Sequence, residues 1–229
     1  MTTISDNLQA VQQRIGAAAR DFGRNSDGIM LLAVSKTWPA EYVRMAAAAG
    51  QRAFGENYVQ EGVDKVMALR ALGLEWHFVG PLQSNKTRLI AESFDWVHSV
   101  DRMRIAERLS EQRPPQTKPL QVCLQINVSG ETTKSGVGID EVGDLADQIM
   151  KLPRLQLRGL MAIPAPSTDF AQQRAAFQVV RQAFERLNQR GLALDTLSMG
   201  MSDDLEAAIA EGATIIRIGT AIFGERNKT

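Results

Sequence analysis

A chain of 229 residues, 44% hydrophobic and 23% charged, has the composition of an ordinary globular protein and can bury a large core. Its 26 basic and 26 acidic side chains cancel, which argues against nucleic acid or an acidic membrane as the main partner, since both favour a clustered positive excess. The only cysteine, Cys123, excludes an internal disulfide, fits a reducing compartment and lies in an apolar run where core packing is its expected role.

Short apolar runs alternate with longer amphipathic segments along the chain. An opening helix is predicted over residues 4–22, where Ile4, Leu8 and Val11 share one face. The following run is apolar on both faces, as in a parallel strand covered by helices. The predicted strands cover residues 29–34, 53–54, 75–79, 96–100, 120–128, 155–163, 196–199 and 214–218. The predicted helices after the first cover residues 40–49, 58–72, 86–93, 101–112, 140–152, 170–190 and 203–211.

This alternation predicts an α/β fold with a parallel sheet. Eight strand–helix units in so short a chain favour a single (β/α)8 TIM barrel, with the opening helix as an extra, over an open doubly wound sheet. Residues 114–119 are rich in proline, but the alternation resumes directly after them, so residues 1–229 are expected to form one domain. The N-terminus lacks the pattern of a signal peptide, and no run approaches the roughly 18 apolar residues of a membrane span, so a cytoplasmic location is expected.

In such a barrel, chemistry gathers where the strands end. Lys36 directly follows the first predicted strand, where burial would disfavour the ammonium form and leave a nucleophilic amine able to form a Schiff base. The plainer interpretation of this residue alone is a solvated or salt-bridged lysine on the barrel rim.

The loops after the seventh and eighth strands carry groups that suit a phosphate. Barrels often bind phosphate at this place, where glycines let backbone N–H groups approach the anion and hydroxyls add donors. The candidate groups are Ser198, Gly200, Gly219 and Thr220. Ser202, Asp203 and Asp204 are instead expected to cap the next helix, with Ser202 as the N-cap.

A strand-end lysine and a phosphate cradle together describe a site for a phosphorylated aldehyde, and pyridoxal 5'-phosphate (PLP) is such a molecule. Enzymes that use PLP place either an acid or an arginine against the ring nitrogen. Arg217 is the candidate for that contact, and an arginine there makes the cofactor a weaker electron sink. The alternative for Arg217 is an ion pair inside the barrel.

Several segments, taken in order, resemble one known family. These segments are residues 32–37, 54–60, 76–86, 159–164, 197–204 and 217–224. The chain is similar over nearly its whole length to the pyridoxal-phosphate homeostasis protein family (the YggS-type proteins), and to its enterobacterial members in particular.

The resemblance implies a barrel like the N-terminal domain of alanine racemase (PLP fold type III). It implies that Lys36 carries PLP as a Schiff base, that Arg217 faces the ring nitrogen and that Asn57 lines the ring. The residues implied for the phosphate are Ser198, Gly200, Met201, Gly219 and Thr220. The implied role is intracellular PLP homeostasis, as a monomeric carrier and buffer that could supply PLP-requiring apo-enzymes.

Other polar residues leave alternatives open. His77 belongs either to the core or to the ring contacts, and His98 is expected to be structural. The two histidines and one cysteine are too far apart in sequence for a metal site. Lys134 and Lys86 are candidates for a second ligand site, although most such lysines are only solvated.

Two enzymatic functions compete with the carrier role. An amino-acid racemase needs proton donors on both faces of the cofactor, and only Lys36 is a candidate, because Tyr42 and Tyr58 fall on early helical segments. The chain also ends soon after the last strand, where related racemases continue into a second domain. An aldolase or isomerase acting on a phosphorylated sugar would need an acid/base pair, for which Glu56 is the only strand-end carboxylate.

Overall fold

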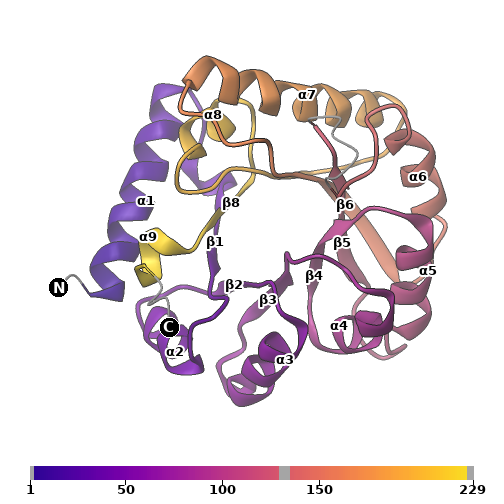
Figure 1. Ribbon diagram of the computed structural model, residues 1–229, viewed down its shortest axis with the longest axis horizontal. Coiled ribbons are helices and arrows are strands. Elements are labelled where there is room, and N and C mark those ends of the chain that lie inside the picture. Colours follow the sequence, from indigo (N-terminus) through magenta and orange to yellow (C-terminus); the bar gives the residue numbers. More distant parts are fainter. Residues whose placement is uncertain (1–2, 129–134, 226–229) are drawn as a thin grey trace.

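The protein folds into a closed parallel β-barrel, described here from a computed structural model that covers residues 3–128 and 135–225 (Figure 1). The strands follow one another around the barrel in chain order, and β1 pairs with β8 to close it. The strands are β1 Met30–Val34, β2 Ala53–Glu56, β3 Glu75–Phe78, β4 Trp96–Val100, β5 Leu120–Ile126, β6 Leu155–Ala162, β7 Thr196–Ser198 and β8 Ile215–Ile218. The predicted (β/α)8 barrel is confirmed.

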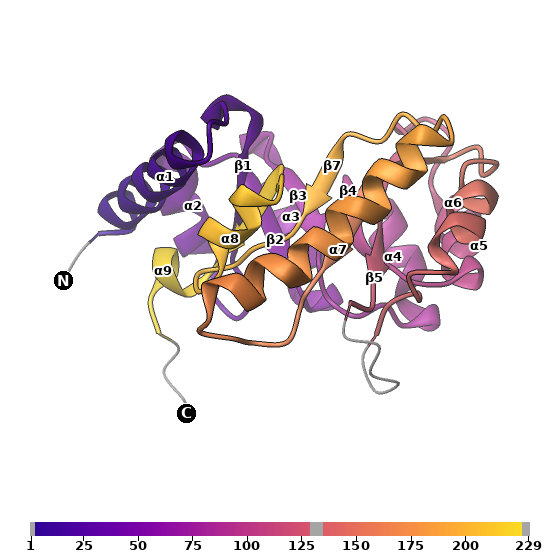
Figure 2. The same cartoon turned by 90° about the horizontal axis from the view of Figure 1, so that it is seen from above.

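Helices surround the barrel as an outer layer (Figures 1 and 2). They are α1 Ile4–Asp21, α2 Ala40–Ala48, α3 Val59–Ala68, α4 Thr87–Ser93, α5 Met103–Gln112, α6 Val142–Ile149, α7 Phe170–Gln189, α8 Leu205–Ala210 and α9 Thr220–Phe223. The extra helix α1 packs against α8 and α9. None of the helices in the described part of the chain has the length and hydrophobicity that crossing a bilayer requires.

The boundaries differ from the predictions in a few places. Strand β2 extends through Gly55 to Glu56, beyond the two residues predicted, because the Glu56 carboxylate is paired inside the protein. Helix α8 begins two residues later than predicted, and α9 was not predicted at all. Lys134, a candidate for a second ligand site, lies outside the described residues.

The interior packs as the apolar runs predict. Cys123 on β5 is fully buried beside Trp96 and Met161, and burial raises the pKa of its thiol to about 12. The expectation that Cys123 is a core residue is confirmed.

Strand β6 needs a glycine where it meets β7. A Cβ on Gly159 would lie 1.7 Å from the carbonyl oxygen of its register partner Thr196, so the two strands could no longer pair at their present spacing. We expect Gly159→Ala to lower the free energy of unfolding by about 3 kcal/mol or more in urea denaturation. Gly28→Ala, where an added Cβ meets nothing within 4 Å, should change it by less than about 0.5 kcal/mol. Equal losses in the two variants would contradict this explanation.

Candidate functional site

A cavity of about 460 Å³ opens at the C-terminal ends of β1 and β8. It brings together five residues that the sequence singled out: Lys36, Met201, Arg217, Gly219 and Thr220. Arg217 lies on β8 and the other four lie on the segments that follow β1, β7 and β8, so barrel closure places together segments that are far apart in the chain. Trp38 also lines this cavity, and it packs against Tyr42 and Phe223.

The turn that carries Lys36 is held in an unusual conformation. The next residue, Thr37, has φ of 69°, a left-handed value that a β-branched residue rarely adopts. Its N–H donates to the Glu61 carboxylate at 2.6 Å. The turn redirects the chain straight after β1 and leaves the half-buried Lys36 on the cavity wall.

A buried ion pair supports this turn from behind. Lys65 on α3 lies 2.7 Å from Glu56 Oε1 and 2.7 Å from Glu61 Oε1, and it also donates to the carbonyl oxygen of Ser35 at 2.7 Å. The Ser35 hydroxyl donates to Glu56 at 2.6 Å. Burial raises the pKa of Glu56, while Lys65 and Ser35 act in the opposite direction. Glu56 thus anchors the Lys36 turn and does not line the cavity.

The loop after β7 forms another wall. Gly200 has φ of 96°, and a Cβ there would lie 2.6 Å from the Cβ of Ala208, so only glycine fits this turn. The backbone N–H of Met201 donates to Asp204 Oδ1 at 2.6 Å. Burial raises the pKa of Asp204, opposed first by this bond and then by Arg217. The expectation that Ser202 caps α8 is wrong, because the N-cap is Asp204 and its carboxylate turns back to Met201.

The loop after β8 forms the third wall. Gly219 lies close to β1, and a Cβ on it would be 3.0 Å from the carbonyl oxygen of Val34. Thr220 begins the short helix α9, where the first N–H groups have no acceptor within the helix. Both residues line the cavity, as the phosphate interpretation requires.

Arg217 projects from β8 into the barrel and is only 5% exposed. Its Nη1 donates to the carbonyl and hydroxyl oxygens of Ser198, and its Nη2 donates to the carbonyl oxygen of Ala162 at 3.0 Å. Burial lowers the pKa of Arg217 to about 10, while Asp204 acts to raise it. Among the described residues no carboxylate forms an ion pair with Arg217, so the alternative of an interior ion pair is not what the structure has.

Three predicted residues do not line this cavity. Gly200 shapes the turn that carries Met201 but is not itself on the cavity wall. The hydroxyl of Ser198 is buried between His98 and Arg217, one step behind the cavity wall. Asn57 lines a neighbouring cavity of about 920 Å³, which shares Met201 and Asp203 with the first. The side-chain oxygen of Asn57 is buried and has no hydrogen-bond partner among the described residues.

Both histidines lie inside the barrel. His77 contacts His98 and Glu75 and stacks on Trp96, and His98 contacts Ser198. His98 therefore contacts Ser198, which lies behind the wall of the 460 Å³ cavity, and neither histidine lines that cavity. Within residues 3–128 and 135–225, no group of three potential metal ligands comes together.

Sequence reasoning missed Trp38 and the bond between Asp204 and Met201. Trp38 follows Lys36 by two residues, so its place after a strand end was a usable signal. The turn of Asp204 toward Met201 had no signal, because an aspartate before a helix is equally compatible with ordinary capping.

Comparison with known proteins gives one consistent result. Residues 4–227 match the family model described as alanine racemase, N-terminal domain. The pyridoxal phosphate homeostasis protein of Escherichia coli (strain K12) is 57% identical over 233 residues, which cover 99% of this chain and 98% of that protein. The protein of the same name from Pseudomonas aeruginosa is 59% identical over 227 residues, covering 99% of this chain and 97% of that protein. The structure of PipY of Synechococcus elongatus PCC7942 with PLP bound has a TM-score of 0.85 at 39% identity and covers 97% of this chain and 100% of that chain.

Proposed function

Because the chain belongs to the pyridoxal phosphate homeostasis protein family, we propose that it binds PLP and serves PLP homeostasis as a carrier and buffer. The observation that carries this proposal is the convergence of Lys36, Arg217 and the two phosphate-type loops on one cavity. PipY, a relative of known structure, has PLP bound.

The residues of the cavity fit the parts of PLP. Lys36 supplies the amine that adds to the aldehyde carbon with loss of water, which forms the Schiff base. Gly219 and Thr220 supply backbone and hydroxyl donors for the phosphate, as does the loop that Gly200 shapes. Arg217 supplies a donor for the ring nitrogen, and a permanent guanidinium there keeps the ring unprotonated.

Two further features suit the cofactor. The partnerless buried oxygen of Asn57 is an acceptor that a ligand could satisfy, and it lies at the adjoining cavity. The Met201 N–H is bonded to Asp204, an anionic group that a phosphate would replace at this position. When bound, PLP brings an electrophilic aldehyde and an electron-withdrawing ring.

A carrier needs less from this site than a racemase does. Neither Tyr42 nor Tyr58 lines the cavity with Lys36, and Tyr58 is 55% exposed at the start of α3. A matched pair of acid and base on the two ring faces, which inversion requires, is thus not supplied by the tyrosines. We propose that residues 1–229 act as one monomeric unit that supplies PLP to apo-enzymes. The single cysteine supports placing this role in the cytoplasm.

The test is uptake and release of PLP by the purified protein. We expect the protein to become yellow with PLP, and borohydride reduction to fix the cofactor to the peptide that contains Lys36. The loaded protein is then added to a PLP-free apo-enzyme. It should restore activity faster than the same amount of free PLP that is first mixed with a PLP scavenger. A protein that stays colourless with PLP contradicts the binding. Rapid interconversion of the L- and D-enantiomers of an amino acid by the loaded protein would instead favour the racemase function.

A further inference from the structure

A line of polar side chains crosses the interior of the barrel. His77 on β3 and His98 on β4 are fully buried, and His77 Nδ1 lies 2.9 Å from His98 Nε2. His98 Nδ1 lies 2.7 Å from the Ser198 hydroxyl on β7, to which Arg217 Nη1 on β8 donates at 2.8 Å. At the other end, His77 Nε2 lies 2.8 Å from Glu75 Oε1. Because β4 and β8 stand across the barrel from each other (Figure 1), these contacts join opposite walls.

The protons of this line have one consistent arrangement when both histidines are neutral. Arginine only donates, so the Ser198 oxygen accepts from Arg217, and the single hydroxyl proton is directed to His98 Nδ1. His98 then carries its proton on Nε2 and donates it to His77 Nδ1. His77 likewise carries its proton on Nε2 and donates it to the Glu75 carboxylate. We call these five residues the transbarrel chain, in which every hydrogen bond points from the cation to the anion.

Burial stabilises the neutral histidines that this arrangement needs. Burial lowers the pKa of His98 well below its usual value, and the nearby His77 and Arg217 act in the same direction. Burial also lowers the pKa of His77, opposed by Glu75. The bond from His77 in turn lowers the pKa of Glu75. The reverse order of protons would require a protonated Glu75, which this shift disfavours.

A few other groups act on the same chain. Asp95 lies near His77, Arg158 lies near Glu75, and Trp96 stacks on His77 and contacts Glu75. At the far end, Asp204 lies near Arg217. A cation therefore lies near the anionic end of the transbarrel chain and a carboxylate near its cationic end.

We propose that the transbarrel chain positions Arg217 for the ring nitrogen of PLP, with Glu75, His77, His98 and Ser198 as positioning residues. This inference rests on the proposed function, because it takes Arg217 as the group that faces the ring. The aligned hydrogen bonds make the Ser198 oxygen a better acceptor, which holds one side of the guanidinium. The carbonyl oxygen of Ala162 holds the other side.

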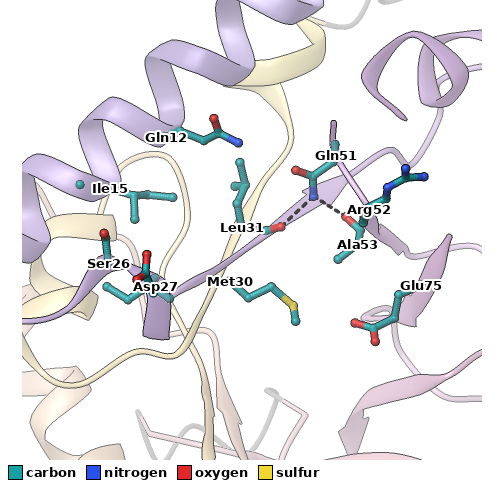
Figure 3. A pocket seen from close by; sticks show the side chains of 12 residues that line it. Gln12, Ile15, Ser26, Asp27, Met30, Leu31, Gln51, Arg52, Ala53 and Glu75 are labelled. Carbon is teal, nitrogen blue, oxygen red and sulfur yellow. Dashed lines mark hydrogen bonds between the residues drawn. The ribbon is translucent and has the colours of Figure 1, made fainter. Parts of the chain in front are cut away.

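The anionic end of the chain opens at the opposite pole of the barrel. A cavity of about 570 Å³ lies at the N-terminal ends of β1, β2 and β3. Glu75, Arg52 and Met30 are among the residues that line it (Figure 3). The Glu75 side chain is 42% exposed and does not line the cofactor cavity. Its charge can therefore be removed by substitution without altering the wall of that cavity. A change at one pole should therefore be felt by the cofactor at the other.

The first arm of the test measures the proton positions in the apo-protein. The protein contains only two histidines, and both belong to the transbarrel chain. Nitrogen NMR of histidine-labelled protein therefore reports directly which ring nitrogens carry the protons. We expect both rings to be neutral with the proton on Nε2, and to stay so across the pH range in which histidines usually titrate. Protons on Nδ1, or a charged ring, would contradict the proposed order of hydrogen bonds in the transbarrel chain, whether or not the protein binds PLP.

The second arm measures the effect on the bound cofactor. We expect Glu75→Leu to weaken PLP binding about three- to tenfold and to shift the pH dependence of the absorbance of the loaded protein. Glu75→Gln, which keeps an accepting oxygen, should lie closer to wild type. Asp27→Asn is the matched control, because it removes a carboxylate from the same polar cavity but not from the chain.

The outcomes separate the inference from the proposed function. If Glu75→Leu and Asp27→Asn give the same binding and spectra, the positioning role is wrong even with the expected histidine protons. If the wild-type protein binds no PLP, the proposed function and the positioning role both fail. The NMR spectra of the apo-protein still decide whether the hydrogen bonds of the transbarrel chain have the proposed order.

Discussion

Lys36→Ala is expected to abolish covalent attachment of PLP and to weaken its binding about a hundredfold, which corresponds to about 2.8 kcal/mol. Among the described residues that line the cavity, the substitution removes the only lysine, while Arg217, Gly219 and Thr220 stay in place. The remaining contacts can hold the phosphate and ring but cannot form a C=N bond. Absorbance titration with PLP measures the affinity, and mass spectrometry after borohydride reduction measures the covalent fraction.

Lys86→Ala is the control for Lys36→Ala. Lys86 also follows a strand at this pole of the barrel but does not line the cofactor cavity. It should keep wild-type colour and affinity, and PLP should raise its melting temperature as it does for wild type. At the same concentration, PLP should raise the melting temperature of Lys36→Ala clearly less than that of wild type. An adduct that survives in Lys36→Ala would assign the Schiff base to another lysine.

The fold was predictable because the strands of a barrel are covered on both faces. Each strand is a short apolar run, and each covering helix has one apolar face, so the two kinds of segment are easy to tell apart. The error at β2 has the same origin. Glu56 is polar, so its position in the sequence indicated the end of the strand. Inside the protein its charge is paired with Lys65 on a later helix, and the local sequence pattern does not predict such a pairing.

The cavity was predictable in part. Lys36, Gly219 and Thr220 follow strand ends directly, and strand ends share one pole of a barrel. Arg217 was predictable as an interior group, but its partners were not. Contacts such as His98 with Ser198, which are 100 residues apart, exist only after the barrel has closed. The transbarrel chain is a product of closure, and strand patterns alone do not reveal which interior side chains meet.

Lys65→Met is expected to lower the free energy of unfolding by about 3–5 kcal/mol. The Glu56 side chain is fully buried, and without Lys65 its carboxylate keeps, among the described residues, only the Ser35 hydroxyl as a partner. An unpaired buried charge costs several kcal/mol, which is a large part of the stability of a typical domain. The loss also leaves the carbonyl oxygen of Ser35, next to Lys36, with the Trp38 N–H as its donor in place of two donors, so PLP binding should weaken in the same variant.

The dependence on pH tests the cause of this loss. Burial raises the pKa of Glu56, so the folded state binds a proton more readily than the unfolded state, and protonation stabilises the folded protein. The deficit of Lys65→Met should therefore be largest at neutral and higher pH and should shrink as the pH falls. Urea denaturation of wild type and variant across this range measures both curves. A deficit that does not change with pH would mean that lost packing, and not the unpaired carboxylate, is responsible.

Two further variants separate the charge from the packing. Glu56→Gln combined with Lys65→Met removes both charges and should recover much of the stability, because replacing a whole buried pair is far cheaper than breaking it. Arg88→Met removes one partner of the exposed pair with Glu92, which has the same helical spacing as Lys65 with Glu61, and should cost less than about 0.5 kcal/mol. If Lys65→Met costs no more than Arg88→Met, the buried pair does not anchor the turn that carries Lys36.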